Sequence, residues 1–181
     1  DCGKVLYYLD ANGRYSKVDS VARLLDQARD VGMDRRIVIF EDPFDQRLEI
    51  DLADLPARFA VDEGLQTAAD VEARVGHGYG AIALKPAGRT LSRTFEIVRA
   101  AHEVGVPCFV ADNACVPILV EWNKNVAARL PCFPGLKVGL LESNGPETYA
   151  GWAELLSAHP QPGASWLRPD GGVFHLDGDY Y

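Results

Sequence analysis

Polar side chains follow directly after short apolar runs at six places along the chain. Intervals of 21 to 31 residues separate them. They are Asp10, Glu41, Asp62, Lys85, Asp112 and Glu142. Each run is typical of a buried parallel strand, and each interval is about one βα unit long. Because the carboxyl ends of the strands in a parallel βα array open on one face, we expect five acids and one lysine to converge on one site.

Three carboxylates from successive strand ends could hold a divalent cation. Mg²⁺ prefers oxygen ligands in octahedral geometry, and neighbouring parallel strands lie about 4.8 Å apart. Asp10, Glu41 and Asp62 are therefore the candidate ligands for Mg²⁺, with Mn²⁺ as the alternative ion. Glu63 follows Asp62 directly, and strand alternation sends the two side chains to opposite sides. A single acid at a strand end is more often a helix N-cap, so the metal interpretation depends on all three occurring together.

Lys85 ends an otherwise apolar strand. A surface lysine whose amine reaches solvent is the structural alternative. Strand ends at a barrel mouth are partly enclosed, however, and a lysine near a dication in a low dielectric has a lowered pKa. Such an amine can take a proton near neutral pH. We therefore predict a catalytic role for Lys85.

The same runs define the elements that must position these side chains. We expect strands over residues 5–9, 37–40, 58–61, 81–84, 108–111 and 138–141. We expect helices over residues 17–31, 68–75, 91–104 and 147–158, and one after Pro117. Strands that alternate with helices predict an α/β fold with a parallel sheet.

Chain length limits how much of a barrel these units can form. A closed eight-stranded βα barrel takes about 250 residues, whereas this chain has 181 residues and six βα units. We therefore expect part of a (β/α)8 TIM-type barrel, with its N-terminal portion outside this chain. Residues 1–158 are assigned to the partial barrel, and residues 159–181, rich in Pro, Gly and aromatic side chains, to an extended C-terminal tail.

Composition excludes several classes of partner. The net charge is −8 and no basic cluster is visible, which disfavours nucleic acid. No stretch approaches 18 apolar residues, so we expect no membrane partner. The cysteines include no CxxC pair, and we expect buried reduced thiols, which indicates a cytoplasmic protein. A zinc site from three of them is an alternative. The four cysteines are Cys2, Cys108, Cys115 and Cys132.

Four strand-end motifs carry a resemblance to a known family. They are DAN at residues 10–12, FEDPF at 40–44, VDEG at 61–64 and ALKP at 83–86. In this order and spacing they resemble motifs of the enolase superfamily, in the muconate lactonizing enzyme and mandelate racemase branch. The resemblance corresponds to strands three to eight of that family's barrel. It implies a (β/α)8 barrel and an N-terminal α+β capping domain that lies outside this chain. We expect the C-terminal tail to pack on the barrel or on the capping domain.

The resemblance also implies a reaction. Mg²⁺ on Asp10, Glu41 and Asp62 would stabilise the enediolate formed when a proton alpha to a substrate carboxylate is removed. Enolase-superfamily sites pair such an ion with a Lys or His base, and Lys85 matches the sixth-strand lysine of the muconate lactonizing type. No histidine follows the seventh strand, which disfavours the mandelate racemase version. The expected protein is a racemase or epimerase, a cycloisomerase or a dehydratase, with a small carboxylate-bearing substrate.

Two further strand ends carry candidate site residues. Glu142 matches an eighth-strand acid that, when protonated, can hydrogen-bond the substrate carboxylate; helix capping is its alternative. Asp112, with Asn113, could orient Lys85 or line the substrate pocket, or simply form a loop turn. Glu142-Ser143-Asn144 stands where dipeptide epimerases of the family often carry Asp-x-Asp, so a dipeptide substrate is not supported.

Some features leave other functions open. The family's second-strand Lys-x-Lys would lie before residue 1, and this chain has DEG where relatives often have DES. A non-catalytic relative acting as a binding or assembly subunit is therefore an alternative. A different metal-dependent barrel, such as an aldolase or sugar isomerase, is another. We expect a homo-oligomer, because this family often assembles.

Overall fold

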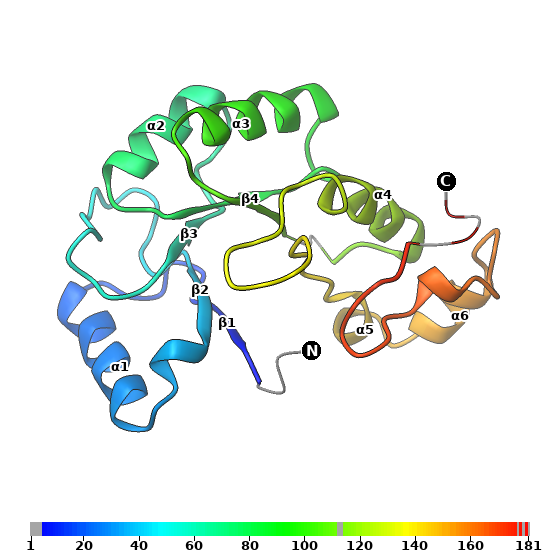
Figure 1. Cartoon of the computed structure of the whole chain (residues 1–181), viewed down its shortest axis with the longest axis horizontal. Helices are drawn as coiled ribbons and strands as arrows, with labels where there is room; N and C mark the ends of the chain where they lie inside the picture. The colour runs from blue at the N-terminus through cyan, green and yellow to red at the C-terminus, as the bar shows by residue number, and fades with distance from the viewer. Residues whose placement is uncertain (1–4, 112–113, 177, 179, 181) are drawn as a thin grey trace.

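A computed structural model describes residues 5–111, 114–176, 178 and 180 of the chain. Five parallel strands form one curved sheet in sequence order, and Figure 1 shows helices along its outer, convex side. The strands are β1 (Tyr7–Asp10), β2 (Ile37–Glu41), β3 (Phe59–Val61), β4 (Ala81–Leu84) and β5 (Cys108–Val110). The expected α/β fold with a parallel sheet is confirmed, and the sheet has the shape of half a barrel.

The helices alternate with the strands as the apolar spacing predicts. The α-helices are α1 (Val18–Asp30), α2 (Ala68–Gly76), α3 (Leu91–Glu103), α4 (Pro117–Ala127), α5 (Gly145–Thr148) and α6 (Trp152–Ser157). Two 3₁₀ turns are η1 (Asp34–Arg36) and η2 (Ser165–Leu167). Local signals set the start of α2, where the backbone N–H of Thr67 donates to Oδ2 of Asp70 at 2.7 Å in a capping box.

The prediction of a strand over residues 138–141 is wrong. Leu141 forms only an isolated parallel bridge with Val110, supported by a bond from the Val110 N–H to the Leu140 carbonyl at 3.0 Å. Gly139 explains the weak pairing, because a Cβ there would lie 2.3 Å from the carbonyl oxygen of Ala127. Glycine inside a strand weakens it and marks close backbone approach.

The predicted last helix over residues 147–158 is broken into α5 and α6. Tyr149 has extended backbone angles, and Gly151 is the N-cap residue that precedes the second helix. A side chain at Gly145 would lie 2.4 Å from the ring of Trp152, so the two short helices pack closely at this corner. The break follows from this packing, which local helical spacing does not reveal.

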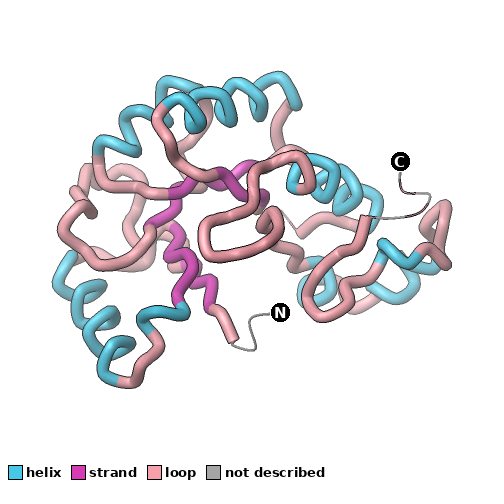
Figure 2. The backbone as a smooth tube through the Cα atoms, in the orientation of Figure 1, coloured by secondary structure: helices cyan, strands magenta, loops and turns pink. Residues whose placement is uncertain are grey.

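Each strand sends alternate side chains to the two faces of the sheet. The convex face packs against the helices through a large cluster that includes Val21, Phe40, Val61, Ile82, Ile97 and Val126. The concave face carries smaller side chains, and Phe133 from the loop between α4 and Leu141 packs on them. This loop lies in front of the sheet in Figure 2. The concave-face residues are Ile39, Ala60, Ala81, Ala83, Phe109 and Ala111.

The C-terminal segment packs on α4 and α6. Trp166 and Leu167 cluster with Leu156. The buried ammonium of Lys124 donates to the Trp166 carbonyl at 2.7 Å, and the Tyr180 hydroxyl donates to a carbonyl of α4 at 2.7 Å. These contacts tie the tail to the last long helix.

The structure also describes three of the four cysteines and the apolar character of the helices. Among the described cysteines, none forms a disulfide; Cys108 and Cys115 are buried as expected, but Cys132 is exposed because it lies in the loop after α4. In the part of the chain that the structure describes, no helix has both the length and the apolar character needed to cross a bilayer.

Candidate metal and active site

Three carboxylates meet at the carboxyl ends of β2 and β3. Glu41, Asp42 and Asp62 are all buried, and each offers an oxygen within 4.8 Å of the others. Glu41 ends β2, and Asp62 directly follows β3, the neighbouring strand. Two of the three predicted ligands therefore converge, together with an acid that the sequence did not single out.

Asp42 shapes this group through the backbone of the next strand. Its carboxylate accepts the backbone N–H of Glu63 at 2.7 Å and that of Asp62 at 3.3 Å. Its φ of +33° lies in the left-handed region, which turns the chain just before Pro43. Burial raises the pKa of Asp42 to about 7, although the two backbone donors oppose the shift. Asp42 thus holds the end of β3 that carries Asp62.

Asp10 lies beside this group rather than in it. It is exposed at the end of β1, in register with Glu41 on β2. Its carboxylate accepts the backbone N–H of Asn12 at 2.8 Å and the Asn12 side-chain amide at 2.5 Å. The negative charge of Asp10 still contributes to raising the pKa of Glu41. The three predicted ligands therefore come from three adjacent strands, but the described structure gathers only two of them tightly.

Burial and neighbouring acids dominate the electrostatics of the group. Desolvation is the main cause that raises the pKa of Glu41, a hydrogen bond from Tyr8 opposes it, and the charge of Asp62 adds to it. Oδ1 of Asp62 is buried without a hydrogen-bond partner among the described residues. A crowded set of carboxylate oxygens with one unsatisfied member fits a hard divalent cation.

Lys85 contacts the acidic group from β4. Its Nζ lies 2.5 Å from Oδ2 of Asp62, and both side chains are largely removed from solvent. Burial alone would lower the pKa of Lys85, but the hydrogen bond and charge of Asp62 outweigh it, so the pKa is raised. The carboxylate stabilises the ammonium form in this arrangement; the lowered pKa expected from the sequence applies to a lysine beside a dication and stays a prediction.

Tyr8 is a second site residue that the sequence did not single out. Its hydroxyl donates a hydrogen bond to Oε2 of Glu41, and burial raises its pKa, so that the phenol stays protonated. Its ring packs edge-on against Phe109, with centroids 5.7 Å apart. The available signal was the period of two along β1, which places Tyr8 on the same face as Asp10.

The two remaining predicted residues have different outcomes. Glu142 follows the bridge at Leu141, and its backbone N–H donates to the Val110 carbonyl at 2.9 Å. Its charge contributes to the raised pKa of Tyr8, so Glu142 lies within electrostatic range of the site. Asp112, with Asn113, lies outside the described residues.

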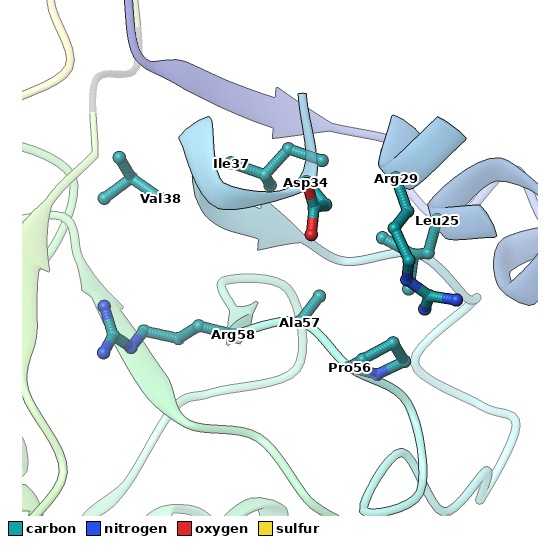
Figure 3. Close-up of a pocket in the computed structure, with 8 residues that line it drawn as sticks. All are labelled: Leu25, Arg29, Asp34, Ile37, Val38, Pro56, Ala57 and Arg58. Carbon is teal, nitrogen blue, oxygen red and sulfur yellow. The ribbon is translucent and has the colours of Figure 1, made fainter. Parts of the chain in front are cut away.

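A hollow of about 330 Å³ lies at the opposite end of the sheet (Figure 3). Ile37 and Val38 line it from the start of β2, and Ala57 and Arg58 from the segment just before β3. Because the acidic group lies at the carboxyl ends of these strands, the hollow and the candidate site are separate.

Comparison with known proteins relates this geometry to solved structures. No family model and no curated protein matches the chain. The L-Ala-D/L-Glu epimerase from Bacillus subtilis aligns with a TM-score of 0.65 and 18% identity over 81% of this chain. Muconate lactonizing enzyme from Pseudomonas putida aligns with a TM-score of 0.62 and 19% identity over 78%. The chain has the fold of mandelate racemase/muconate lactonizing proteins.

The resemblance seen in the strand-end motifs is therefore confirmed at the level of the mandelate racemase/muconate lactonizing fold. A third structure with this fold, the dipeptide epimerase from Cytophaga hutchinsonii, is complexed with Mg and the dipeptide D-Ala-L-Val; it aligns with a TM-score of 0.63 and 17% identity over 80% of this chain. The chain covers 40% of the Bacillus epimerase, 39% of the Pseudomonas enzyme and 38% of the Cytophaga epimerase. The parallel half-barrel corresponds to part of their fold.

Proposed function

We propose that this protein is an enolase-superfamily isomerase or lyase that removes a proton alpha to the carboxylate of a small substrate with the help of Mg²⁺. The observation that carries the proposal is the Lys85–Asp62 contact beside a buried group of carboxylates. A lysine that reaches a carboxylate cluster at the carboxyl edge of a βα sheet is the arrangement such chemistry needs. It favours an enzyme over a non-catalytic relative.

Asp10, Glu41 and Asp62 are the proposed ligands of the cation. Asp42 is a poorer candidate, although it is closer than Asp10, because its oxygens already accept two backbone N–H groups. Asp62 retains a buried oxygen without a partner among the described residues. Asp10 ends the strand next to Glu41 and lies in register with it, and its carboxylate would have to leave its hydrogen bonds to Asn12 to join the group. When bound, Mg²⁺ would stabilise negative charge that develops on the substrate carboxylate.

Lys85 is the proposed base. Its pKa is raised by Asp62, and burial acts in the opposite direction. A cation held by Asp62 would weaken the attraction of that carboxylate for the ammonium, so burial would favour the neutral amine of Lys85 and its proton would pass to solvent. Neutral Nζ of Lys85 then accepts the alpha proton of the substrate. Glu142 is the proposed donor to the substrate carboxylate, and Asp112 the residue that orients Lys85.

Calorimetric titration with Mg²⁺ tests the ligand assignment. Asp10→Asn, Glu41→Gln and Asp62→Asn should each weaken Mg²⁺ binding by at least about tenfold, which corresponds to roughly 1.4 kcal/mol. Asp45→Asn is the matched control, because Asp45 is an acid in the loop after β2 that pairs with Arg47. The proposal fails if the wild-type protein has no measurable affinity for Mg²⁺, or if all four variants bind it equally.

Solvent exchange tests the reaction class. With Mg²⁺ in deuterated water, the protein should incorporate deuterium alpha to the carboxylate of at least one acid in a panel. The panel should include muconolactone and D-Ala-L-Val, which are bound in structures of this fold. Exchange with muconolactone but not with the dipeptide would support the expectation drawn from Glu142-Ser143-Asn144. Absence of exchange across the panel, with Mg²⁺ bound, would count against an alpha-proton reaction.

A further inference from the structure

We infer that Tyr8 is a positioning residue that sets the orientation of the Glu41 carboxylate for cation binding. This inference rests on the proposed function, because it concerns the same group of acids. Tyr8 holds Oε2 of Glu41 through its hydroxyl and leaves the other carboxylate oxygen outside that bond. It does so from β1, the strand that also carries Asp10.

The strand register explains how Tyr8 reaches Glu41. The pairing of β1 with β2 shifts between Tyr7 and Tyr8, so that Tyr8 lies opposite Ile39, two residues before Glu41. Side chains two residues apart along a strand share a face. Tyr8 therefore faces the concave side, where it packs with the cluster around Ile39. From Tyr8 to Asp10 the register is unbroken, so Tyr8 and Asp10 lie on the same face as Ile39 and Glu41.

Successive edge-on contacts between aromatic rings fix the orientation of the Tyr8 ring. Its ring meets Phe109 of β5 edge-on, with centroids 5.7 Å apart and planes at 89°. Phe109 meets Phe133 in the same way at 5.9 Å. The guanidinium of Arg58 lies over the Phe133 ring, 5.4 Å from its centroid, and is the last group in this series of contacts. A phenol held in this manner has little freedom to follow a moving carboxylate, so it defines where Glu41 points.

Orientation of one ligand has a measurable effect on affinity. A glutamate side chain has several rotatable bonds, and a fixed donor on one oxygen reduces the loss of side-chain entropy when a cation binds. Hydrogen-bond partners of metal ligands change metal affinity by about 10-fold to 100-fold when they are removed. The packing role of Tyr8 is separable from this effect, because phenylalanine retains the ring and its contact with Phe109.

The test compares Tyr8→Phe with Tyr15→Phe by Mg²⁺ calorimetry and by urea unfolding without Mg²⁺. Tyr15 is the matched control, since its ring meets Phe40 edge-on at 6.1 Å. We expect Tyr8→Phe to weaken Mg²⁺ binding about 10-fold to 100-fold, and Tyr15→Phe to leave Mg²⁺ affinity unchanged. The urea unfolding midpoints of the two variants should be close to one another. Equal affinity of Tyr8→Phe and wild type would overturn the inference about Tyr8 and leave the proposed function standing.

Combining Tyr8→Phe with Glu41→Asp shows whether Tyr8 acts on Mg²⁺ affinity by positioning Glu41 or by disturbing the structure in general. Glu41→Asp keeps a carboxylate but shortens the side chain, which withdraws it from the Tyr8 hydroxyl. In this background Tyr8→Phe should have no further effect on Mg²⁺ affinity, because the two changes remove the same interaction. An undiminished effect of Tyr8→Phe in that background would show that Tyr8 acts by another route. Absence of Mg²⁺ binding by the wild type would instead refute the proposed function itself.

Discussion

Nζ of Lys85 lies 2.5 Å from Oδ2 of Asp62, across the neighbouring strands β4 and β3. The proposed base and a proposed metal ligand are thus partners of one another. An ammonium group and a divalent cation at the same carboxylate repel each other. Binding of the cation and release of the lysine proton are therefore expected to be linked.

Replacement of Lys85 separates these two roles. Lys85→Met should lower deuterium exchange alpha to the substrate carboxylate by about 10²-fold to 10⁴-fold, because a general base is lost. Mg²⁺ affinity should be retained or increased, since the competing positive charge at Asp62 is removed. Calorimetry and exchange measured on the same samples check both parts. Lys137→Met, at an exposed position, is the control; unchanged exchange in Lys85→Met would rule out Lys85 as the base.

The buried acids predict an unusual pH dependence of stability without divalent cations. The pKa of Asp42 rises from 3.8 unfolded to about 7 folded, and that of Glu41 is raised as well. Between those two values the folded protein binds more protons than the unfolded chain, so these groups lower the free energy of unfolding as pH rises. Urea unfolding in EDTA should show a decrease of at most about 1.4 kcal/mol per pH unit from each group.

Asp42→Asn provides the control for that pH dependence. It removes one titrating group but keeps a side-chain oxygen that can accept the N–H of Glu63. The decrease in stability across the pH range from 3.8 to about 7 should therefore be smaller in this variant. An identical pH profile in both proteins would contradict the assignment of a raised pKa to Asp42.

Lys124 joins the C-terminal segment to α4. Its buried ammonium donates to Glu121 at 2.8 Å and to the Trp166 carbonyl at 2.7 Å, and lies 4.0 Å from the Phe174 ring centroid. Lys124→Met should lower the free energy of unfolding by about 3 kcal/mol or more, because it leaves the Glu121 carboxylate partly buried without its partner. Adding Glu121→Gln should recover part of the loss. Urea unfolding checks both, and a loss below about 1 kcal/mol would contradict the pairing.

Two neighbouring glycines allow a matched test of the turn before β4. Gly78 has a φ of +86°, and a Cβ there would lie 2.5 Å from the backbone nitrogen of Ala53. Gly78→Ala should therefore destabilise the protein by more than about 2 kcal/mol. Gly76, at the end of α2, has no atom within 4 Å of such a Cβ, so Gly76→Ala should be neutral or stabilise by up to about 1 kcal/mol. Thermal unfolding of both variants measures the difference.

Apolar runs were sufficient to predict the sheet. The strand over residues 81–84 was predicted with the bounds found for β4, because four consecutive apolar residues between glycine and Lys85 have one plausible role in a parallel sheet. Elements near the C-terminus were predicted less well. Gly139 approaches the backbone of Ala127, and Gly145 packs on Trp152. Such contacts depend on tertiary structure and leave no local pattern.

The proximity of the candidate site residues was predictable where strand position alone decides it. Glu41, Asp62 and Lys85 follow from their places at strand ends, and they do converge. Asp42 was missed because its role depends on a left-handed backbone angle, and Tyr8 because its hydrogen bond to Glu41 depends on how β1 and β2 pair. The lowered pKa expected for Lys85 beside a dication stays a prediction, because in this arrangement the hydrogen bond and charge of Asp62 outweigh burial and raise the pKa.

The loop that carries Phe133 lies on the interior face of the half-barrel, and Arg58 beside it also borders the hollow of Figure 3. The Phe133 ring packs on Phe109, and Phe109 packs on Tyr8, whose hydroxyl donates a hydrogen bond to Glu41. Packed side chains therefore connect the loop of Phe133 to the carboxyl ends of the strands, where the proposed chemistry takes place. A substitution at Phe133 is therefore expected to affect the proposed cation site as well as local packing.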